Sequence, residues 1–242
     1  MNRTLVIGDI HGGLRALHQI MERANVTVND TLIFLGDYVD GWSQSPQVIE
    51  YLIDLSTKQK CIFIRGNHDE LLLDWLENST DNREWYKHGG EATVIAYSTI
   101  SEAIRLKHIE FLKSLENYYL DDKNRLFVHA GFTNMNGVTY EYFPKLFYWD
   151  RTLWETALSL NENLEKTSWF YPRRLTLYHE IFIGHTPVTR IGETIPIKKA
   201  GIWNVDTGAA FKGPLTIMDI DSKEFWQSEP LNNLYPTEKG RN

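Results

Sequence analysis

Three continuous apolar runs in the first third of the chain, each followed by a segment with helical spacing, limit the possible fold more than any other feature. The apolar runs cover residues 3–9, 30–37 and 61–67, and helical spacing follows in residues 14–24, 45–58 and 69–78. Continuous apolar runs indicate strands buried on both faces, and intervening helices make such strands parallel neighbours joined by right-handed crossovers. The fold class is therefore predicted to be α/β.

The remaining sequence adds helices and then further strands. Helical spacing continues through residues 89–119, a strand is predicted at 125–131, and residues 132–180 are expected to form a long aromatic loop with some helix. Four more strands are predicted at residues 181–185, 201–208, 214–220 and 224–229. Because the chain has no internal repeat, low-complexity run or Pro/Gly-rich linker, we expect a single domain over residues 1–242.

Composition narrows the possible partners. The net charge of -7 disfavours a nucleic-acid partner, since nucleic-acid-binding surfaces are usually basic. No apolar stretch reaches the ~20 residues of a membrane-spanning helix, and no signal peptide is recognisable, so no membrane association is expected. Cys61 is the single cysteine, which excludes an internal disulfide, and it is expected to be a small buried residue. A cytoplasmic location is predicted, whereas the oligomeric state stays open.

Polar side chains follow five of the predicted strands, at the point where each strand ends. They are Asp9 and His11, then Asp37 and Asp40, then Arg65, Asn67, His68 and Asp69, and later His129 and His185. The carboxyl ends of parallel strands meet at one edge of a sheet, where ligands bind. We therefore expect these side chains to converge on one small volume.

Such a concentration of carboxylates and imidazoles requires compensation, and divalent cations provide it. A set of His, Asp and Asn donors without a thiolate suits Mn²⁺, Fe or Zn²⁺ rather than a structural zinc site. The donors outnumber the ligands of one catalytic ion, and a carboxylate can bridge two ions. The pattern therefore predicts a binuclear centre, with metals ~3.5–4 Å apart.

Several of these residues, taken singly, have simpler interpretations. Asp9 alone is equally compatible with a turn, and His185 alone is typical of a surface loop. Asp69 is expected to cap the helix that follows it. Asp206 fits a turn as well as the border of a site, and it is left out of the set. The metal interpretation depends on the ensemble, because every member falls at the same end of its strand.

Five segments, taken in order, resemble the signature of metallophosphoesterases. They are "GDIHG" at 8–12, "GDYVDGW" at 36–42, "RGNHD" at 65–69, "HAG" at 129–131 and "GHT" at 184–186. Within that superfamily the chain resembles phosphoprotein phosphatases of the bacterial and phage serine/threonine type, which are related to symmetrical diadenosine tetraphosphate hydrolases. The resemblance implies a four-layer α/β/β/α sandwich of two mixed sheets flanked by helices.

The resemblance also implies a role for each residue. Asp9 and His11 would bind one metal ion, Asn67, His129 and His185 would bind the other, and Asp37 would bridge the two. His68 would be the general acid that protonates the leaving oxygen, and Asp40 would orient it. Arg65 and Asn67 would contact the phosphate. Two divalent ions are expected, with Mn²⁺ preferred and Fe or Zn²⁺ as alternatives.

The chain departs from the family pattern at two places. Family members carry Arg-Gly after GDxVD, whereas this chain has Gly41-Trp42, so one arginine is missing. Arg151 is a candidate for a second phosphate contact, with a surface ion pair as the alternative. Pro187 stands where nuclease relatives have the second histidine of GHxH, which argues against a nuclease.

Aromatic side chains near these motifs have two interpretations. Tyr38, Trp42, Tyr148 and Trp149 are compatible with walling the pocket and with packing in the core.

The predicted function is a metal-dependent phosphomonoester hydrolase, namely a serine/threonine or dual-specificity protein phosphatase. A metal-bridging hydroxide would attack phosphorus in line, and His68 would act as the general acid. Its partner would be a phosphorylated protein or peptide, or a small phosphoester. The alternative is a symmetrical hydrolase of diadenosine tetraphosphate, which would use the same inner residues. A non-catalytic scaffold is disfavoured, because all six candidate ligands and His68 are present.

Overall fold

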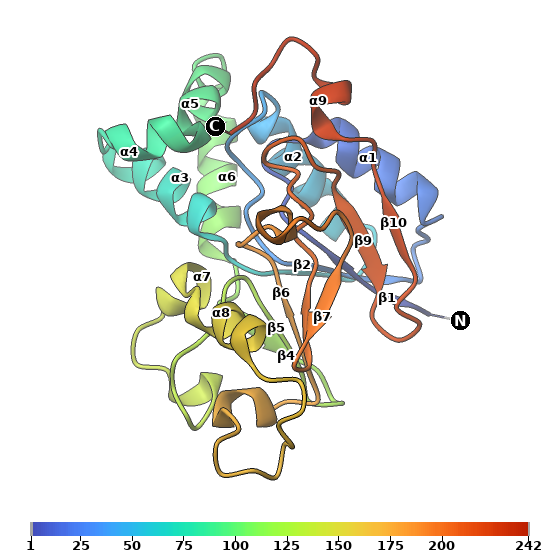
Figure 1. Cartoon of the computed structure of the whole chain (residues 1–242). Coiled ribbons are helices and arrows are strands. Elements are labelled where there is room, and N and C mark those ends of the chain that lie inside the picture. Colours follow the sequence, from blue (N-terminus) through green and yellow to red (C-terminus); the bar gives the residue numbers. More distant parts are fainter. Residues whose placement is uncertain (1, 242) are drawn as a thin grey trace.

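Two five-stranded mixed sheets pack face to face in the protein (Figure 1), whose computed structural model describes residues 2–241. The first sheet has the order β10-β9-β1-β2-β3 and contains β1 (Thr4–Ile7), β2 (Thr31–Phe34), β3 (Cys61–Phe63), β9 (Thr216–Asp219) and β10 (Phe225–Gln227). The second has the order β4-β5-β6-β8-β7 and contains β4 (Tyr118–Leu120), β5 (Arg125–Val128), β6 (Glu180–Ile183), β7 (Ile197–Lys199) and β8 (Ile202–Asn204). In each sheet three adjacent strands run parallel, namely β1, β2 and β3 in the first and β5, β6 and β8 in the second.

Alternate side chains of each central strand reach different layers, because successive residues of a strand point to opposite faces. Val6 of β1 and Ile33 of β2 pack between the sheets with Phe127 of β5. Leu5 and Ile7, on either side of Val6, face the helices that cover the first sheet. The apolar runs are continuous because both faces of the strands are buried.

Helices cover the outer face of each sheet. The first sheet is covered by α1 (Leu14–Arg23), α2 (Ser45–Ser56), α3 (Asn67–Asn78), α5 (Glu91–Tyr97) and α6 (Glu102–Lys113), and the second by α7 (Leu146–Trp149) and α8 (Thr152–Ser159). Shorter pieces are α4 (Arg83–Trp85), α9 (Leu231–Leu234), a π-helical turn at Tyr86–Gly90 and 3₁₀ turns at Val138–Tyr140, Arg173–Thr176 and Val188–Ile191. The predicted four-layer α/β/β/α arrangement is confirmed.

Three local expectations were wrong. The helix predicted up to residue 119 ends at Lys113, and Tyr118–Leu120 form β4, because Tyr119 pairs with Phe127 across an antiparallel ladder. Strand β7 was not expected and pairs with β8. Cys61 is only partly buried, on the edge strand β3, and burial raises the pKa of its thiol to about 12. Over residues 2–241, none of the helices is long and apolar enough to cross a lipid bilayer.

The inter-sheet core provides a test of the fold. Phe127 is fully buried and stacks on Phe182, with ring centroids 4.9 Å apart. Phe127→Ala should lower the free energy of unfolding by about 3–5 kcal/mol, because it leaves a cavity between the sheets. Urea denaturation measures this. Tyr142→Ala is the control, since the Tyr142 side chain is exposed, and it should change the same quantity by no more than about 0.5 kcal/mol. Equal effects of the two substitutions would contradict the layered core.

Candidate metal centre

All six predicted metal ligands are buried, and all lie just beyond the carboxyl ends of parallel strands. Asp9 and His11 follow β1, Asp37 follows β2, Asn67 follows β3, His129 follows β5, and His185 follows β6. The two sheets therefore contribute to one site from both sides, as the rule on strand ends predicts.

The ligand atoms form two adjacent groups that share Asp37. Asp9, His11 and Asp37 each place a ligand atom within 4.8 Å of the others, and so do Asp37, His129 and His185. Oδ2 of Asp37 lies 3.5 Å from Nε2 of His11 and 3.5 Å from Nε2 of His129. This arrangement could hold two divalent ions with one carboxylate between them.

The amide oxygen of Asn67 belongs to the second group. Its Oδ1 lies 2.9 Å from Nδ1 of His185 and 3.3 Å from Nε2 of His129. The second group therefore offers a carboxylate, two imidazoles and an amide oxygen, a mixed donor set without sulfur.

Two of the histidines are held in the tautomer that a metal ligand needs. Nδ1 of His11 donates to the carbonyl oxygen of Val39 at 3.0 Å, and Nδ1 of His129 donates to that of Leu35 at 2.8 Å. A carbonyl oxygen can only accept, so the proton resides on Nδ1 and the lone pair of Nε2 faces Asp37. Such a hydrogen bond behind the ring is the usual support of a metal-binding histidine.

The electrostatics of the cluster call for cations. Burial, with a further contribution from Asp206, raises the pKa of Asp9 well above its usual range, and burial raises that of Asp206 to about 6. Burial, and then the charge of His129, lowers the pKa of His185. Within residues 2–241, Oδ1 of Asp9 and Nε2 of His185 are buried without a hydrogen-bond partner. The residues present therefore fit a pair of divalent ions, which would compensate the buried carboxylates and be held by the donor atoms that face one another in the two groups.

Four site residues have strained backbone conformations. His11, Asp37, Asp40 and His185 adopt φ angles of 51°, 53°, 73° and 66°. Residues other than glycine rarely adopt such angles, and they persist where the surrounding structure enforces them. Within residues 2–241, four of the nine non-glycine residues with positive φ are thus residues that the sequence predicts to be functional.

Asp69 helps to hold this strained loop. Its carboxylate accepts hydrogen bonds from the backbone N–H groups of Gly66, Asp37 and Tyr38, at 2.8, 2.8 and 2.9 Å. Helix α3 begins at Asn67, so Asp69 is its third residue, and it caps the helix from within the first turn by accepting the N–H of Gly66. The same carboxylate joins the start of α3 to the loop after β2.

The predicted acid and its orienting carboxylate are in contact. Nδ1 of His68 lies 2.6 Å from Oδ2 of Asp40, and the same oxygen accepts a hydrogen bond from Nε1 of Trp85. With Nδ1 held by Asp40, the other ring nitrogen of His68 is free for the cavity that this residue lines.

The structure does not bring Arg65 to the cluster. Its guanidinium pairs with Glu70 at 2.5 Å and donates to the carbonyl oxygens of Leu112 and Lys113 at the end of α6. The long side chain is satisfied by acceptors near its own strand, so the expected phosphate contact of Arg65 is absent from this arrangement.

A cavity of about 350 Å³ adjoins the ligands. It is lined by Asn67, His68, Trp149, Arg151, Arg190 and Arg241, among others. Within residues 2–241, the guanidinium groups of Arg151, Arg190 and Arg241 form no ion pair with a carboxylate. Nη1 of Arg151 donates to Oγ1 of Thr186 at 3.2 Å, next to His185. Sequence reasoning found Arg151 but missed Arg190 and Arg241. Arg190 follows the "GHT" motif closely, whereas no local pattern marks Arg241.

The four aromatic residues near the motifs divide between the two interpretations. Tyr38, Trp42 and Tyr148 are buried and pack in the core. Trp149 is 44% exposed and lines the cavity.

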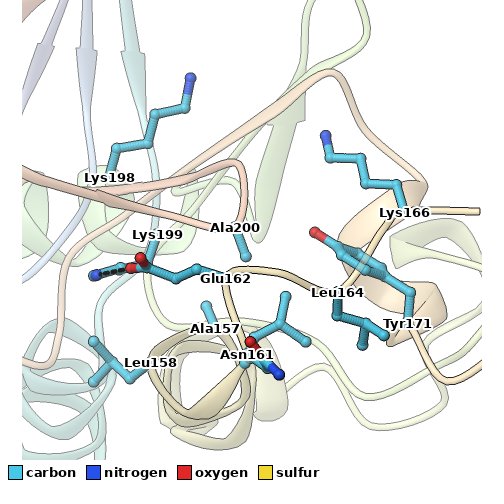
Figure 2. Close-up of a pocket in the computed structure, with 11 residues that line it drawn as sticks. Ala157, Leu158, Asn161, Glu162, Leu164, Lys166, Tyr171, Lys198, Lys199 and Ala200 are labelled. Atoms are coloured by element: carbon cyan, nitrogen blue, oxygen red, sulfur yellow. Dashed lines mark hydrogen bonds and ion pairs between the residues drawn. The ribbon is translucent and has the colours of Figure 1, made fainter. Parts of the chain in front are cut away.

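A second cavity, of about 390 Å³, lies beside α8 and β7 and is lined by none of the six ligands (Figure 2). Lys199 pairs there with Glu162, and Lys198 pairs with Glu180. Its charges are thus largely neutralised, unlike those of the arginine-lined cavity.

Comparison with known families agrees with this geometry. The calcineurin-like phosphoesterase family matches residues 2–210. The chain belongs to this family. The resemblance to metallophosphoesterases is confirmed, and the protein is a phosphoesterase.

Similar proteins include nucleotide hydrolases and phosphatases. The chain is 28% identical to "Bis(5'-nucleosyl)-tetraphosphatase PrpE [asymmetrical]" of Anoxybacillus flavithermus, over 98% of this chain and 97% of the relative. It is 27% identical to the protein of the same name from Oceanobacillus iheyensis, over 91% and 89%. A serine/threonine phosphatase from Saccharomyces cerevisiae shares the fold, with a TM-score of 0.62 at 14% identity over 94% of this chain and 80% of that one.

Removal of the shared carboxylate tests the centre. Asp37→Ala should lower the bound metal from about two ions per chain to fewer than one, because both donor groups lose a ligand. Elemental analysis by mass spectrometry after loading with Mn²⁺ and desalting measures this. His18→Ala removes an exposed histidine and should leave the metal content unchanged. Full occupancy in Asp37→Ala would show that Asp37 does not hold the ions.

Proposed function

We propose that the protein hydrolyses dinucleoside polyphosphates, such as diadenosine tetraphosphate, at a binuclear metal centre. The observation that carries this proposal is the set of three guanidinium groups around one cavity, those of Arg151, Arg190 and Arg241, which form no ion pair within residues 2–241. One phosphoryl group offers few oxygens, whereas a chain of several phosphates can occupy three arginines. The exposed ring of Trp149 adds a surface on which a base can stack.

The inner residues keep the roles that the family resemblance implies. Two divalent ions are held by Asp9, His11, Asp37, Asn67, His129 and His185, with Mn²⁺ preferred and Fe or Zn²⁺ as alternatives. Bound there, the ions would supply a water of lowered pKa as the nucleophile. Asn67 also faces the phosphate, from its place on the cavity wall.

Proton transfer to the leaving group is assigned to His68. Its contact with Asp40 fixes the orientation of the ring, so that the other ring nitrogen can face the leaving oxygen. Arg151 is held beside His185 through Thr186, so its guanidinium can bind oxygens of a phosphate that contacts the metals.

The arginine-lined cavity and the names of the relatives favour a dinucleoside polyphosphate hydrolase over a protein phosphatase. The sequence favours a protein phosphatase, whereas the two relatives described above are named asymmetrical tetraphosphatases and a further one, from Pseudomonas entomophila, is named a symmetrical tetraphosphatase. We therefore expect cleavage of diadenosine tetraphosphate to ATP and AMP, in place of the two ADP molecules that a symmetrical hydrolase would release.

A serine/threonine protein phosphatase is the second candidate. The segment between β5 and β6, which carries Trp149 and Arg151, also exposes Tyr142, Phe143 and Trp169. Exposed aromatic side chains close to one another in sequence favour a macromolecular substrate.

A direct substrate comparison tests these alternatives. Protein loaded with Mn²⁺ is assayed with diadenosine tetraphosphate, a phosphoserine peptide and para-nitrophenyl phosphate, and kcat/KM is measured for each. The kcat/KM for diadenosine tetraphosphate should exceed that for the peptide by at least about tenfold, since only the phosphate chain of diadenosine tetraphosphate can reach all three arginines. Chromatography of the products should show ATP and AMP. A preference for the phosphopeptide would favour the second candidate and overturn the first.

The acid assignment has its own test. His68→Asn should retain the metals but lower kcat by about 10²–10⁴-fold, with the largest loss for substrates that have poor leaving groups. Steady-state kinetics with aryl phosphates of increasing leaving-group pKa measure this. His179→Asn changes an exposed histidine and serves as the control. Wild-type turnover by His68→Asn would refute the assignment.

A further inference from the structure

The loop that lacks the family arginine is contacted by a distant part of the chain. After α9, residues 236–241 return across the molecule and reach Gly41 near α5 (Figure 1). The backbone N–H of Arg241 donates to the carbonyl oxygen of Ala210 at 2.8 Å, which fixes the position of this residue.

Two glycines make room for the side chain of Arg241. A Cβ atom on Gly41 would lie 3.2 Å from Cγ of Arg241, and one on Gly89 would lie 2.9 Å from the same atom. The two glycines have φ angles of 97° and 104°, and the N–H of Gly41 donates to the carbonyl oxygen of Gly89 at 3.1 Å. A side chain at either position would be strained and would press on Arg241.

Trp42 anchors the same segment. Its ring is fully buried and stacks on Tyr235 with centroids 5.1 Å apart, and its Nε1 donates to the carbonyl oxygen of Ala209 at 2.7 Å. A Cβ atom on Gly240 would lie 2.7 Å from the indole, so the segment passes directly against it.

A polar contact holds the segment at a second point. The backbone N–H and Oγ of Ser43 donate to the carboxylate of Glu238 at 2.9 and 2.8 Å. Trp42 and Ser43, the two residues that follow position 41, thus hold residues 235–240 in place.

The guanidinium of Arg241 reaches the cavity and forms no ion pair or side-chain hydrogen bond with residues 2–241. Arg241 lines that cavity together with Asn67 and His68, and its side chain packs over the ring of Phe211 at 5.4 Å. Within residues 2–241, Nε of Arg241 is buried and has no hydrogen-bond partner. A cavity-lining guanidinium without such partners suits a ligand that offers several acceptor oxygens, as phosphate does.

We infer that Arg241 is a substrate-binding residue, which contacts the phosphate in place of the arginine absent at position 41. The Gly41-Trp42 pair, at the position of the family Arg-Gly, provides the space and the anchor for its approach. The inference rests on the proposed function only in that the substrate carries a phosphate group, and it does not depend on the nucleoside parts.

A matched pair of variants tests this inference. Arg241→Met keeps most of the aliphatic side chain that packs over the glycines and removes the charge. Lys239→Met removes the same charge two residues earlier, from an exposed side chain that does not line the metal-site cavity. Both variants are loaded with Mn²⁺, checked for metal content and thermal stability, and assayed with para-nitrophenyl phosphate and with inorganic phosphate as the inhibitor.

Arg241→Met should raise KM and the inhibition constant of phosphate about 10- to 100-fold, as expected for loss of a charge-assisted bidentate contact. Arg241→Lys should recover part of the loss, since it restores the charge without the planar fork. Lys239→Met should behave as the wild type. Wild-type KM and phosphate inhibition in Arg241→Met would overturn the inference.

Docking of the segment is tested by a double variant. Glu238→Ala releases the contact with Ser43 and should weaken phosphate inhibition in the wild-type background, but not further in Arg241→Met. Additive effects would show that Glu238 does not act through Arg241 and would contradict the docking argument.

The two proposals fail separately. If diadenosine tetraphosphate is not hydrolysed but Arg241→Met still weakens phosphate binding, the proposed substrate is wrong and the inference holds. If diadenosine tetraphosphate is hydrolysed and Arg241→Met binds phosphate normally, the proposed function holds and the inference is wrong.

Discussion

The carboxylate of Asp37 is the group on which the rest of the site depends. It lies between imidazoles from both sheets, 3.5 Å from His11 and 3.5 Å from His129, and its Oδ1 accepts the backbone N–H of His68 at 2.9 Å. A buried carboxylate in this position requires positive charge on both sides. The loop that carries it adopts left-handed φ angles and is tied to α3 by Asp69, so the structure holds Asp37 in place at a conformational cost.

The centre of the fold and the convergence of the candidate metal ligands were predictable from sequence because both follow from topology. Parallel strands such as β1 and β2 bring their carboxyl ends together, whatever the loops between them do. This rule does not predict which partner a long side chain contacts. Arg65 follows a strand as expected, but its guanidinium forms an ion pair with Glu70, one turn along α3. Arg241 could not be predicted, because its position depends on the docking of a segment remote from the motifs. Tyr118 and Tyr119 became a strand through pairing with β5, a tertiary contact that overrides helical spacing.

The candidate metal ligands and the arginines that line the cavity come from different kinds of elements. The candidate metal ligands stand at strand ends, where hydrogen-bonded sheets restrict their movement. In contrast, Arg151 directly precedes α8, Arg190 lies in a 3₁₀ turn and Arg241 lies in the segment after α9. Rigid elements suit ligands that must meet a narrow coordination geometry, and loops suit the recognition of different phosphorylated substrates. A sequence relative named as a nucleotide hydrolase and a fold neighbour named as a serine/threonine phosphatase are compatible with this division.

The central claim is that two divalent ions bind on either side of Asp37. The most direct measurement is anomalous X-ray diffraction from crystals of the protein grown with Mn²⁺. We expect two anomalous peaks about 3.5–4 Å apart, one near Asp9 and His11 and the other near Asn67, His129 and His185, with the carboxylate of Asp37 between them. A single peak, or none within coordination distance of Asp37, would contradict the account.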